Sequence, residues 1–140
     1  MKSKSSTGFS LVELLVVIAL IGILSAVGIV TYNGYVTSTK KNSAENTIQQ
    51  IALAQTEEYA NSGSYSVTGD PPTDACSANN LTSLEIESEL FGGDNIIPDD
   101  IDFEMCIYGS GSTFTIQAEH QKSECTITLV RNGATTRTDC

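Results

Sequence analysis

The residue that most needs a chemical explanation is Glu13, because its carboxylate lies in a segment that is otherwise apolar enough to enter a lipid bilayer. An almost unbroken apolar run follows it, from Leu14 to Val30. A charged side chain near the centre of a bilayer costs about 2.5–3.5 kcal/mol on insertion scales, so a carboxylate kept there usually has a partner or a function. Just ahead of it, Gly8 is a conformationally free border between a polar head carrying Lys2 and Lys4 and the apolar run.

A second set of potential ligands is the acidic stretch of residues 85–104. The sequence has no Lys or Arg between residues 42 and 121, and the formal charge of the chain is −10. This charge argues against direct nucleic-acid binding, because phosphate backbones require a positive surface. The first interpretation is a solvated acidic face that keeps the protein soluble. The alternative is a calcium site of oxygen ligands, whose spacing matches no EF-hand loop. Its ligands would be Asp99, Asp100, Asp102 and Glu104.

Residue types that commonly support catalysis are sparse. His120 is the single histidine, at the polar end of an expected strand beside Lys122 and Glu124. No P-loop, dinucleotide-binding glycine motif or zinc-ligand spacing is present. None of the paired carboxylates is marked out by an apolar pocket that would tune its pKa. We therefore predict that the chain is not an enzyme and uses no cofactor.

The elements that position Glu13 begin with a membrane span. As a helix, residues 9–32 would extend about 36 Å at 1.5 Å per residue, enough to cross a hydrocarbon core of about 30 Å. The two lysines of the head place the N-terminus in the cytoplasm by the positive-inside rule, so the rest of the chain lies outside. The alternative is a cleaved secretory signal with its border near Leu24-Ser25-Ala26. Glu13 and the apolar residues beyond that border argue against it.

Helical periodicity continues after Tyr32 into a water-soluble segment. Its apolar positions fall near one face, and this face carries Val36, Ala44, Ile48, Ile51, Ala52, Gln55 and Tyr59. No proline interrupts residues 9–62. We predict one helix of about 50 residues, apolar all round over 9–32 and amphipathic over 33–62. Asn61-Ser62-Gly63 provides the stop signal.

Residues 63–100 have the composition of a connecting region, rich in Ser, Thr, Asp, Gly and Pro. Asp70-Pro71-Pro72 predicts a turn within it. Thr82-x-x-Glu85 fits the capping-box pattern, and Gly92-Gly93 can end a helix. A short helix is therefore expected inside this region.

From Ile101 the apolar period falls to two, which predicts strands with one buried face. Asn132-Gly133 is the strongest hairpin signal in the chain. Residues 101–140 therefore predict three or four antiparallel strands. Their apolar face needs a cover, and the amphipathic half of the long helix can supply it. The expected class is α+β, with the long N-terminal helix packed on the sheet.

The four cysteines all follow the apolar run and form no C-x-x-C pair, which favours disulfides outside the cytoplasm. Three pairings are open. We favour Cys125 with Cys140, which closes the final hairpin and tail, and Cys76 with Cys106, which ties the connecting region to the first strand. Each bond would contribute about 2–4 kcal/mol.

Taken together, these features resemble the type IV pilins, whose precursors carry class III signal peptides. The specific part is Gly8-Phe9-Ser10-Leu11-Val12-Glu13 and the apolar residues after it. The closing segment, from Cys125 to Cys140 with an Asn-Gly turn, is also similar to the disulfide-closed end of many pilins. Val30 stands near the position where many pilins have a proline.

The resemblance implies a fold, a processing pathway and partners. Prepilin peptidase would remove residues 1–8 by cutting after Gly8 and would N-methylate Phe9. Subunits would lie in the inner membrane and then enter an extracellular helical filament through residues 9–60, on an inner-membrane assembly platform. Glu13 would pair with the Phe9 amine of a neighbouring subunit, whereas the alternative is a carboxylate that only reaches up to the headgroups. The filament would be a pilus for adhesion, motility, aggregation or DNA uptake; the alternative is a pseudopilin of a type II secretion system.

Overall fold

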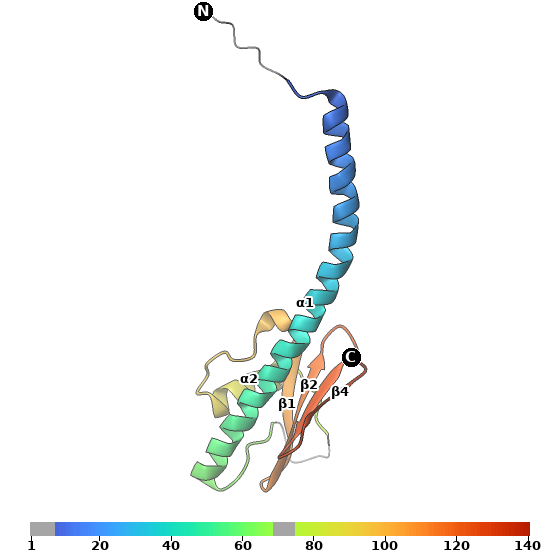
Figure 1. The fold of residues 1–140 in the computed structure, drawn as a ribbon. Coiled ribbons are helices and arrows are strands. Elements are labelled where there is room, and N and C mark those ends of the chain that lie inside the picture. Colours follow the sequence, from blue (N-terminus) through green and yellow to red (C-terminus); the bar gives the residue numbers. More distant parts are fainter. Residues whose placement is uncertain (1–7, 69–74) are drawn as a thin grey trace, which may run out of the picture. The chain divides into compact units, whose positions relative to one another are not determined.

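The computed structural model describes residues 8–68 and 75–140, and the expected turn at residues 70–72 lies outside them. The chain divides into two compact units after Ser38. Its elements in order are α1 (Leu11–Ser62), α2 (Asn80–Leu90), the 3-10 turn η1 (Asp99–Ile101) and strands β1 (Phe103–Ser110), β2 (Thr113–His120), β3 (Thr126–Val130) and β4 (Thr135–Thr138). The α+β class is confirmed: in the unit of residues 39–140, α1 packs on a four-stranded antiparallel sheet (Figure 1).

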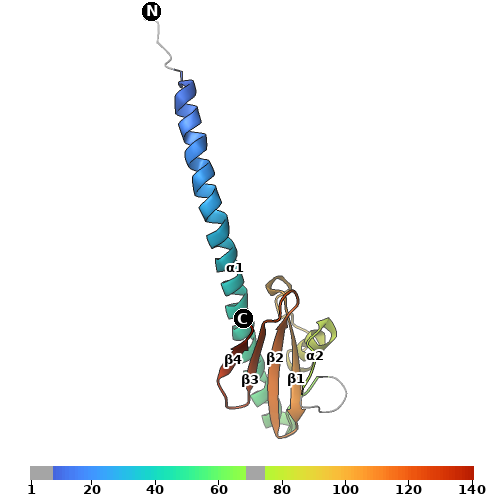
Figure 2. The same ribbon diagram turned by 90° about the vertical axis from the view of Figure 1, so that its right-hand side faces the viewer.

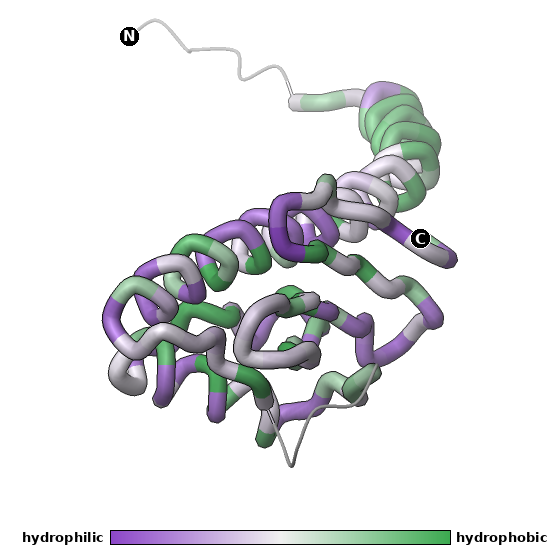
Figure 3. The backbone as a smooth tube through the Cα atoms, turned by 90° about the horizontal axis from the view of Figure 1, so that it is seen from below, coloured by the Kyte–Doolittle hydropathy of each residue, from purple (hydrophilic) through white to green (hydrophobic). Residues whose placement is uncertain are grey.

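Helix α1 is continuous over 52 residues, which confirms the prediction of one long helix. Colouring by hydropathy separates an apolar first half from a second half of mixed polarity (Figure 3). The buried residues of α1 all lie in the second half, at helical spacing: Ala44, Thr47, Ile48, Ile51 and Gln55. The helix ends where expected. Gly63 takes a positive φ of 79° and donates its N–H to the Tyr59 carbonyl at 2.9 Å, a left-handed cap that suits glycine.

The sheet is a simple meander in the order β1-β2-β3-β4 (Figure 2). Its register pairs Ile107 with Ile116 and Ala118 with Ile127, so apolar side chains face the same layer. These residues join Ile48 and the rest of the buried face of α1 in one core. The two-residue period of the sequence therefore predicted the buried face of β1 correctly.

The first strand begins two residues later than the apolar alternation indicated. Ile101 belongs to η1, and Asp102 follows with a φ of +58°, a left-handed conformation that interrupts the extended chain. Ile101 is nevertheless buried. Its apolar side chain fills the core from a turn, which a period of two cannot distinguish from a strand.

Helix α2 forms as expected but begins earlier than Thr82. Its N-cap is Asn79, whose side chain accepts hydrogen bonds from the N–H groups of Leu81 and Thr82. The Thr82 hydroxyl in turn accepts from the Asn79 N–H at 3.0 Å. Thr82 therefore closes a capping box from its third position rather than starting the helix. The helix ends before Gly92 and Gly93, both at positive φ.

The outer edge of β1 is covered by hydroxyl groups. Thr68 accepts from the N–H of Ile107 at 2.9 Å and donates to its carbonyl at 3.1 Å. From α2, Ser83 accepts from the N–H of Met105, and Thr82 donates to the Met105 carbonyl. These side chains satisfy backbone groups that an edge strand would otherwise present to another strand.

Two disulfides close the fold, Cys76–Cys106 and Cys125–Cys140. They are the two pairs favoured from the sequence. The first closes 30 residues of sequence and joins the connecting region to β1; the second closes 15 residues around β3 and β4. Cys106 and Cys125 are buried. In the described residues no cysteine is free.

The turn between β1 and β2 depends on Gly109, which has a φ of +139°. A Cβ there would lie 2.5 Å from the Thr113 carbonyl oxygen. We expect Gly109→Ala to lower the free energy of unfolding by about 1–3 kcal/mol, because the strain comes from backbone atoms. Urea unfolding of the purified protein measures it. Gly111→Ala is the matched control, since its Cβ would meet only Ser64 at 3.5 Å; equal effects would contradict the assignment.

Candidate functional site

The candidate site lies at the N-terminus of α1, where the Glu13 carboxylate caps its own helix. Glu13 Oε2 accepts a hydrogen bond from the Ser10 N–H at 2.8 Å. The Ser10 hydroxyl in return accepts from the Glu13 N–H at a longer 3.4 Å. This reciprocal pair is a capping box, and it adds a negative charge to the positive end of the helix dipole. The Ser10-x-x-Glu13 spacing is itself a capping-box signal, although the role of Ser10 was not predicted from the sequence.

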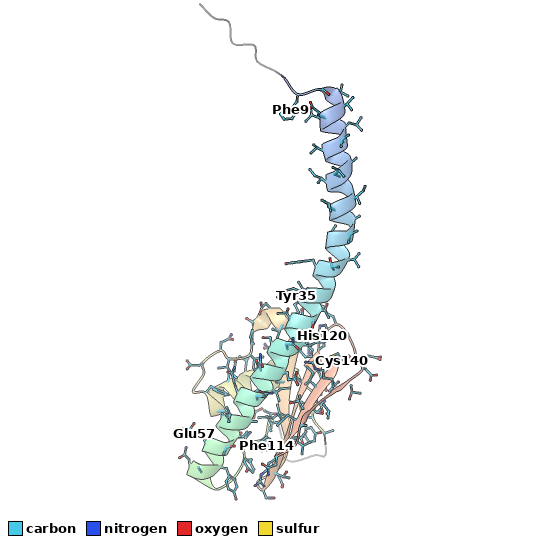
Figure 4. All side chains as sticks on the ribbon, viewed as in Figure 1. Phe9, Tyr35, Glu57, Phe114, His120 and Cys140 are labelled. Carbon is cyan, nitrogen blue, oxygen red and sulfur yellow. A yellow bond between two sulfur atoms is a disulfide. The ribbon has the colours of Figure 1, made fainter. Side chains whose placement is uncertain are left out.

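The surface beyond this cap is apolar and uncovered. Phe9 is 82% exposed and projects ahead of the first turn of α1 (Figure 4). Every residue from Leu11 to Val30 is exposed. The helix is long and apolar enough to cross a membrane, and none of the most apolar stretch is buried within the chain. An apolar surface of this extent marks a contact with lipid or with other protein.

The fold places no demand for glycine at the polar border. Nothing lies within 4 Å of the position that a Cβ would take at Gly8, and its φ is not in the left-handed region. Lys2 and Lys4 lie outside the described residues. The structure thus presents, side by side in the sequence, an unhindered glycine, an exposed Phe9 and a carboxylate three residues into the helix.

This segment matches a family model. The match covers residues 3–29 and is to the prokaryotic N-terminal methylation motif. The chain carries the methylation motif of type IV pilins. Its α+β architecture, with a long N-terminal apolar helix, is likewise pilin-like.

A relative supports the same family. A fimbrial protein of Neisseria meningitidis serogroup B is 35% identical over 82 residues, which are 59% of this chain and 45% of the fimbrial protein. The chain thus matches less than half the length of that relative. No solved structure matches it. The chain is thus similar to a fimbrial protein in part of its length and to the N-terminal methylation motif over residues 3–29.

In the body, by which we mean residues 39–140, the calcium site that the sequence suggested does not form. Among the described residues no group of three or more Asp, Glu, His or Cys is placed to hold a metal ion. Asp102 instead accepts hydrogen bonds from Lys40 of α1 and Lys122 of the loop after β2. Glu104 is engaged by the Ser83 hydroxyl. Asp102 and Glu104 are thus used to hold neighbouring elements together, whereas Asp99 and Asp100 are exposed in η1.

The same pattern extends to the other cations of the body. Arg137 on β4 bonds to Asn42 and Glu45 on α1. Lys41 donates to the carbonyl of Cys140. Arg131 lies over the ring of Tyr65, and its guanidinium carbon is 5.1 Å from the ring centroid. The positive charges therefore serve internal contacts, and the outer surface of the body is left mainly acidic.

His120 also has a structural role. Its ring packs edge-on against Phe103 at a centroid distance of 4.9 Å. Its Nδ1 accepts the N–H of Lys122 at 3.1 Å and so shapes the turn between β2 and β3. In the described part of the chain, the contacts of the His120 ring are with Phe103 and Lys122, and neither residue is a nucleophile of the Ser or Cys type. Its contacts agree with the interpretation of His120 as a sheet residue.

The Asp102 contacts predict a pH dependence. The hydrogen bonds of Lys122 and Lys40 lower the pKa of Asp102 from 3.8 to about 2. A lowered carboxyl pKa stabilises the fold above the unfolded-state value, and the contribution is lost as the pH falls from 3.8 through 2. We expect Asp102→Asn to be less stable than wild type above pH 4 and the difference to shrink below it. Chemical unfolding at several pH values measures this. Asp94→Asn, at an exposed position, controls for net charge; a pH-independent difference would contradict the expectation.

Proposed function

We propose that this protein is the structural subunit of a type IV pilus, held in the inner membrane before assembly and packed in the filament through residues 9–60. The observation that carries the proposal is the exposed apolar half of α1, with a single carboxylate in its first turn. A surface of this kind is soluble in lipid and, once removed from lipid, needs protein partners. The same helix can therefore serve first as an anchor and then as an assembly core.

Processing of the precursor would create a positive charge, the Phe9 amine, that can pair with the Glu13 carboxylate of a neighbouring subunit. Hydrolysis of the Gly8–Phe9 peptide bond by prepilin peptidase would release residues 1–8 with a carboxylate on Gly8 and leave an amine on Phe9. Transfer of a methyl group from a sulfonium donor would then give a secondary amine, which stays protonated at neutral pH. The fold does not require glycine at residue 8, because a Cβ there would meet no other atom of the described residues. We therefore infer that Gly8 serves recognition by the peptidase. Cleavage also removes Lys2 and Lys4, the positive charges that oppose transfer out of the cytoplasm.

The Glu13 carboxylate is the proposed partner of the Phe9 amine of a neighbouring subunit. In a filament core of low dielectric, an unpaired carboxylate is costly, and a neighbouring ammonium group offsets that cost. The capping box prepares this contact, because it holds the carboxylate at the end of α1 nearest to Phe9. Growth would occur through the inner-membrane assembly platform, with each added subunit matching its charge to the previous one.

Two substitutions separate the charge of Glu13 from its role as a cap. We expect Glu13→Val to be cleaved normally but to give at least about tenfold fewer filaments, because both the cap and the ion pair are lost. Glu13→Gln keeps an acceptor for the Ser10 N–H, as glutamine also serves in capping boxes. It should fail to assemble as well. Immunoblots of cell-bound precursor and sheared filaments measure both steps, and normal filament yield from Glu13→Gln would contradict the ion pair.

Surface preparations test the function itself. Cells should shed long fibres visible by negative-stain microscopy, and mass spectrometry of those fibres should find a peptide that begins with N-methylated Phe9. A pseudopilin would instead give no long fibres, and deletion of its gene would trap exported enzymes in the periplasm. The two disulfides favour the pilus, because they suit a body exposed outside the cell. Fibres lacking this chain would contradict the proposal.

A further inference from the structure

Exposed apolar side chains of the body occur at two places that packing through the apolar half of α1 leaves unused. One place is the second half of α1, where Leu53 is 72% exposed. The other is α2, where Leu81 is 77% exposed and Leu84 is 51% exposed. Single exposed apolar residues are ordinary, but a clustered set marks an interaction surface.

The first place is a groove of about 510 Å³, which we call the Leu53 groove. Its lining is mixed: Leu53, Tyr65, Phe114 and Leu129 are apolar, whereas Gln49 and Arg131 are polar. Arg131 is fixed in place, because it lies over the Tyr65 ring and donates to the Ser112 carbonyl at 2.6 Å. No carboxylate is among the described residues that line the groove. In a chain with a formal charge of −10, this groove combines apolar side chains with a fixed positive charge.

The second place is the exposed side of α2, which we call the α2 face. Leu81 and Leu84 are three residues apart and so lie on adjacent turns of one side of the helix. The helix contains no basic residue; of its three glutamates, Glu87 is buried and accepts hydrogen bonds from the N–H groups of Ile96 and Ile97. Glu89 is exposed near the end of the helix, and Asp94 follows it in the chain. The α2 face is therefore an apolar pair within an acidic surrounding, complementary in charge to the Leu53 groove.

The two surfaces lie on different elements of the body. Helix α2 is bonded to β1 through Thr82 and Ser83, whereas the groove is lined by α1 and by the ends of β2 and β3 at Phe114 and Leu129. A contact between unlike surfaces on the same chain is heterologous. Repetition of such a contact adds copies without limit when the rotation does not close, which gives a filament.

We propose that the α2 face of one copy docks in the Leu53 groove of the next copy and forms a second contact along the filament. The inference rests on the proposed function and adds the surfaces through which the bodies meet. A second copy is the partner that the charges favour: acidic bodies repel over most of their surface, and this pairing places the Arg131 groove against an acidic face. Complementary charges of this kind also set the register of association.

Cysteine cross-linking in sheared filaments of the full chain tests the contact. Filaments of the L53C/L84C double variant should give a ladder of covalent multimers on a non-reducing gel after mild oxidation, and reduction should abolish it. The L53C and L84C single variants should stay monomeric. S123C/L84C is the matched control, with one cysteine moved to the exposed loop after β2, and it should also stay monomeric.

Charge placed in either surface gives an independent measurement. L53D and L84D should each lower filament yield by at least about tenfold, as central interface residues do. Their thermal unfolding should match wild type, because both side chains are exposed. S123D should assemble normally.

The outcomes separate this inference from the proposed function. Wild-type filaments together with an absent ladder and normal yields of L53D and L84D would overturn the docking contact and leave the pilus proposal standing. Dimers from L53C alone would also overturn it, since they would show a symmetric contact. Failure of wild-type cells to form any filament containing this chain would contradict both.

Discussion

The packing of α1 on the sheet is the contact on which the rest of the structure depends. Ile48 and Ile51 are fully buried, as are Ile107 and Ile116 of the facing strands. Burial of each such side chain contributes about 1.5–3 kcal/mol. The helix is therefore not a rod attached to a finished domain: its second half completes the core of the body. Any force or contact applied to the first half of α1 is carried by a helix whose continuation is part of that core.

Polar contacts give this packing a single register. Gln55 is fully buried, and its side-chain amide exchanges two hydrogen bonds with the backbone of Ser66. The amide thus acts as a backbone substitute and directs the chain back along the helix after Gly63. Asp102 and Arg137 then join α1 to the loop before β1 and to β4. Exposed ion pairs contribute little to the free energy of unfolding. Two such pairs between α1 and the sheet layer nevertheless limit how far the helix can slide along the sheet.

The sequence predicted those parts of the molecule that follow from local periodicity. The alternation of Met105 and Ile107 with polar neighbours identified β1, and the spacing of Ile48 and Ile51 identified the buried face of α1. The start of α2 was misjudged because both Asn79 and Thr82 are good caps. The choice between them involves a tertiary bond, from the Thr82 hydroxyl to the Met105 carbonyl.

The candidate site divides in the same way. Glu13 and Gly8 stand out by composition, and the Ser10-x-x-Glu13 cap is a local pattern that can be read directly. The Lys40–Asp102 pair could not be anticipated, since 62 residues separate its members and only the fold brings them together. Because Asp102 is bonded to Lys40 and Lys122, this carboxylate connects elements of the fold and is not free to bind a cation.

The hydroxyls along the outer edge of β1 limit the ways in which copies of this chain could join in the proposed filament. With Thr68, Thr82 and Ser83 occupying that edge, a strand from another copy finds no free backbone ladder there. The opposite edge is β4, which is only four residues long. In the filament proposed above, neighbouring copies would then be joined by side chains and would share no continuous sheet of the amyloid type. In such a filament, the departure of a subunit would break side-chain contacts and would not require the backbone hydrogen bonds of a shared sheet to be unpaired.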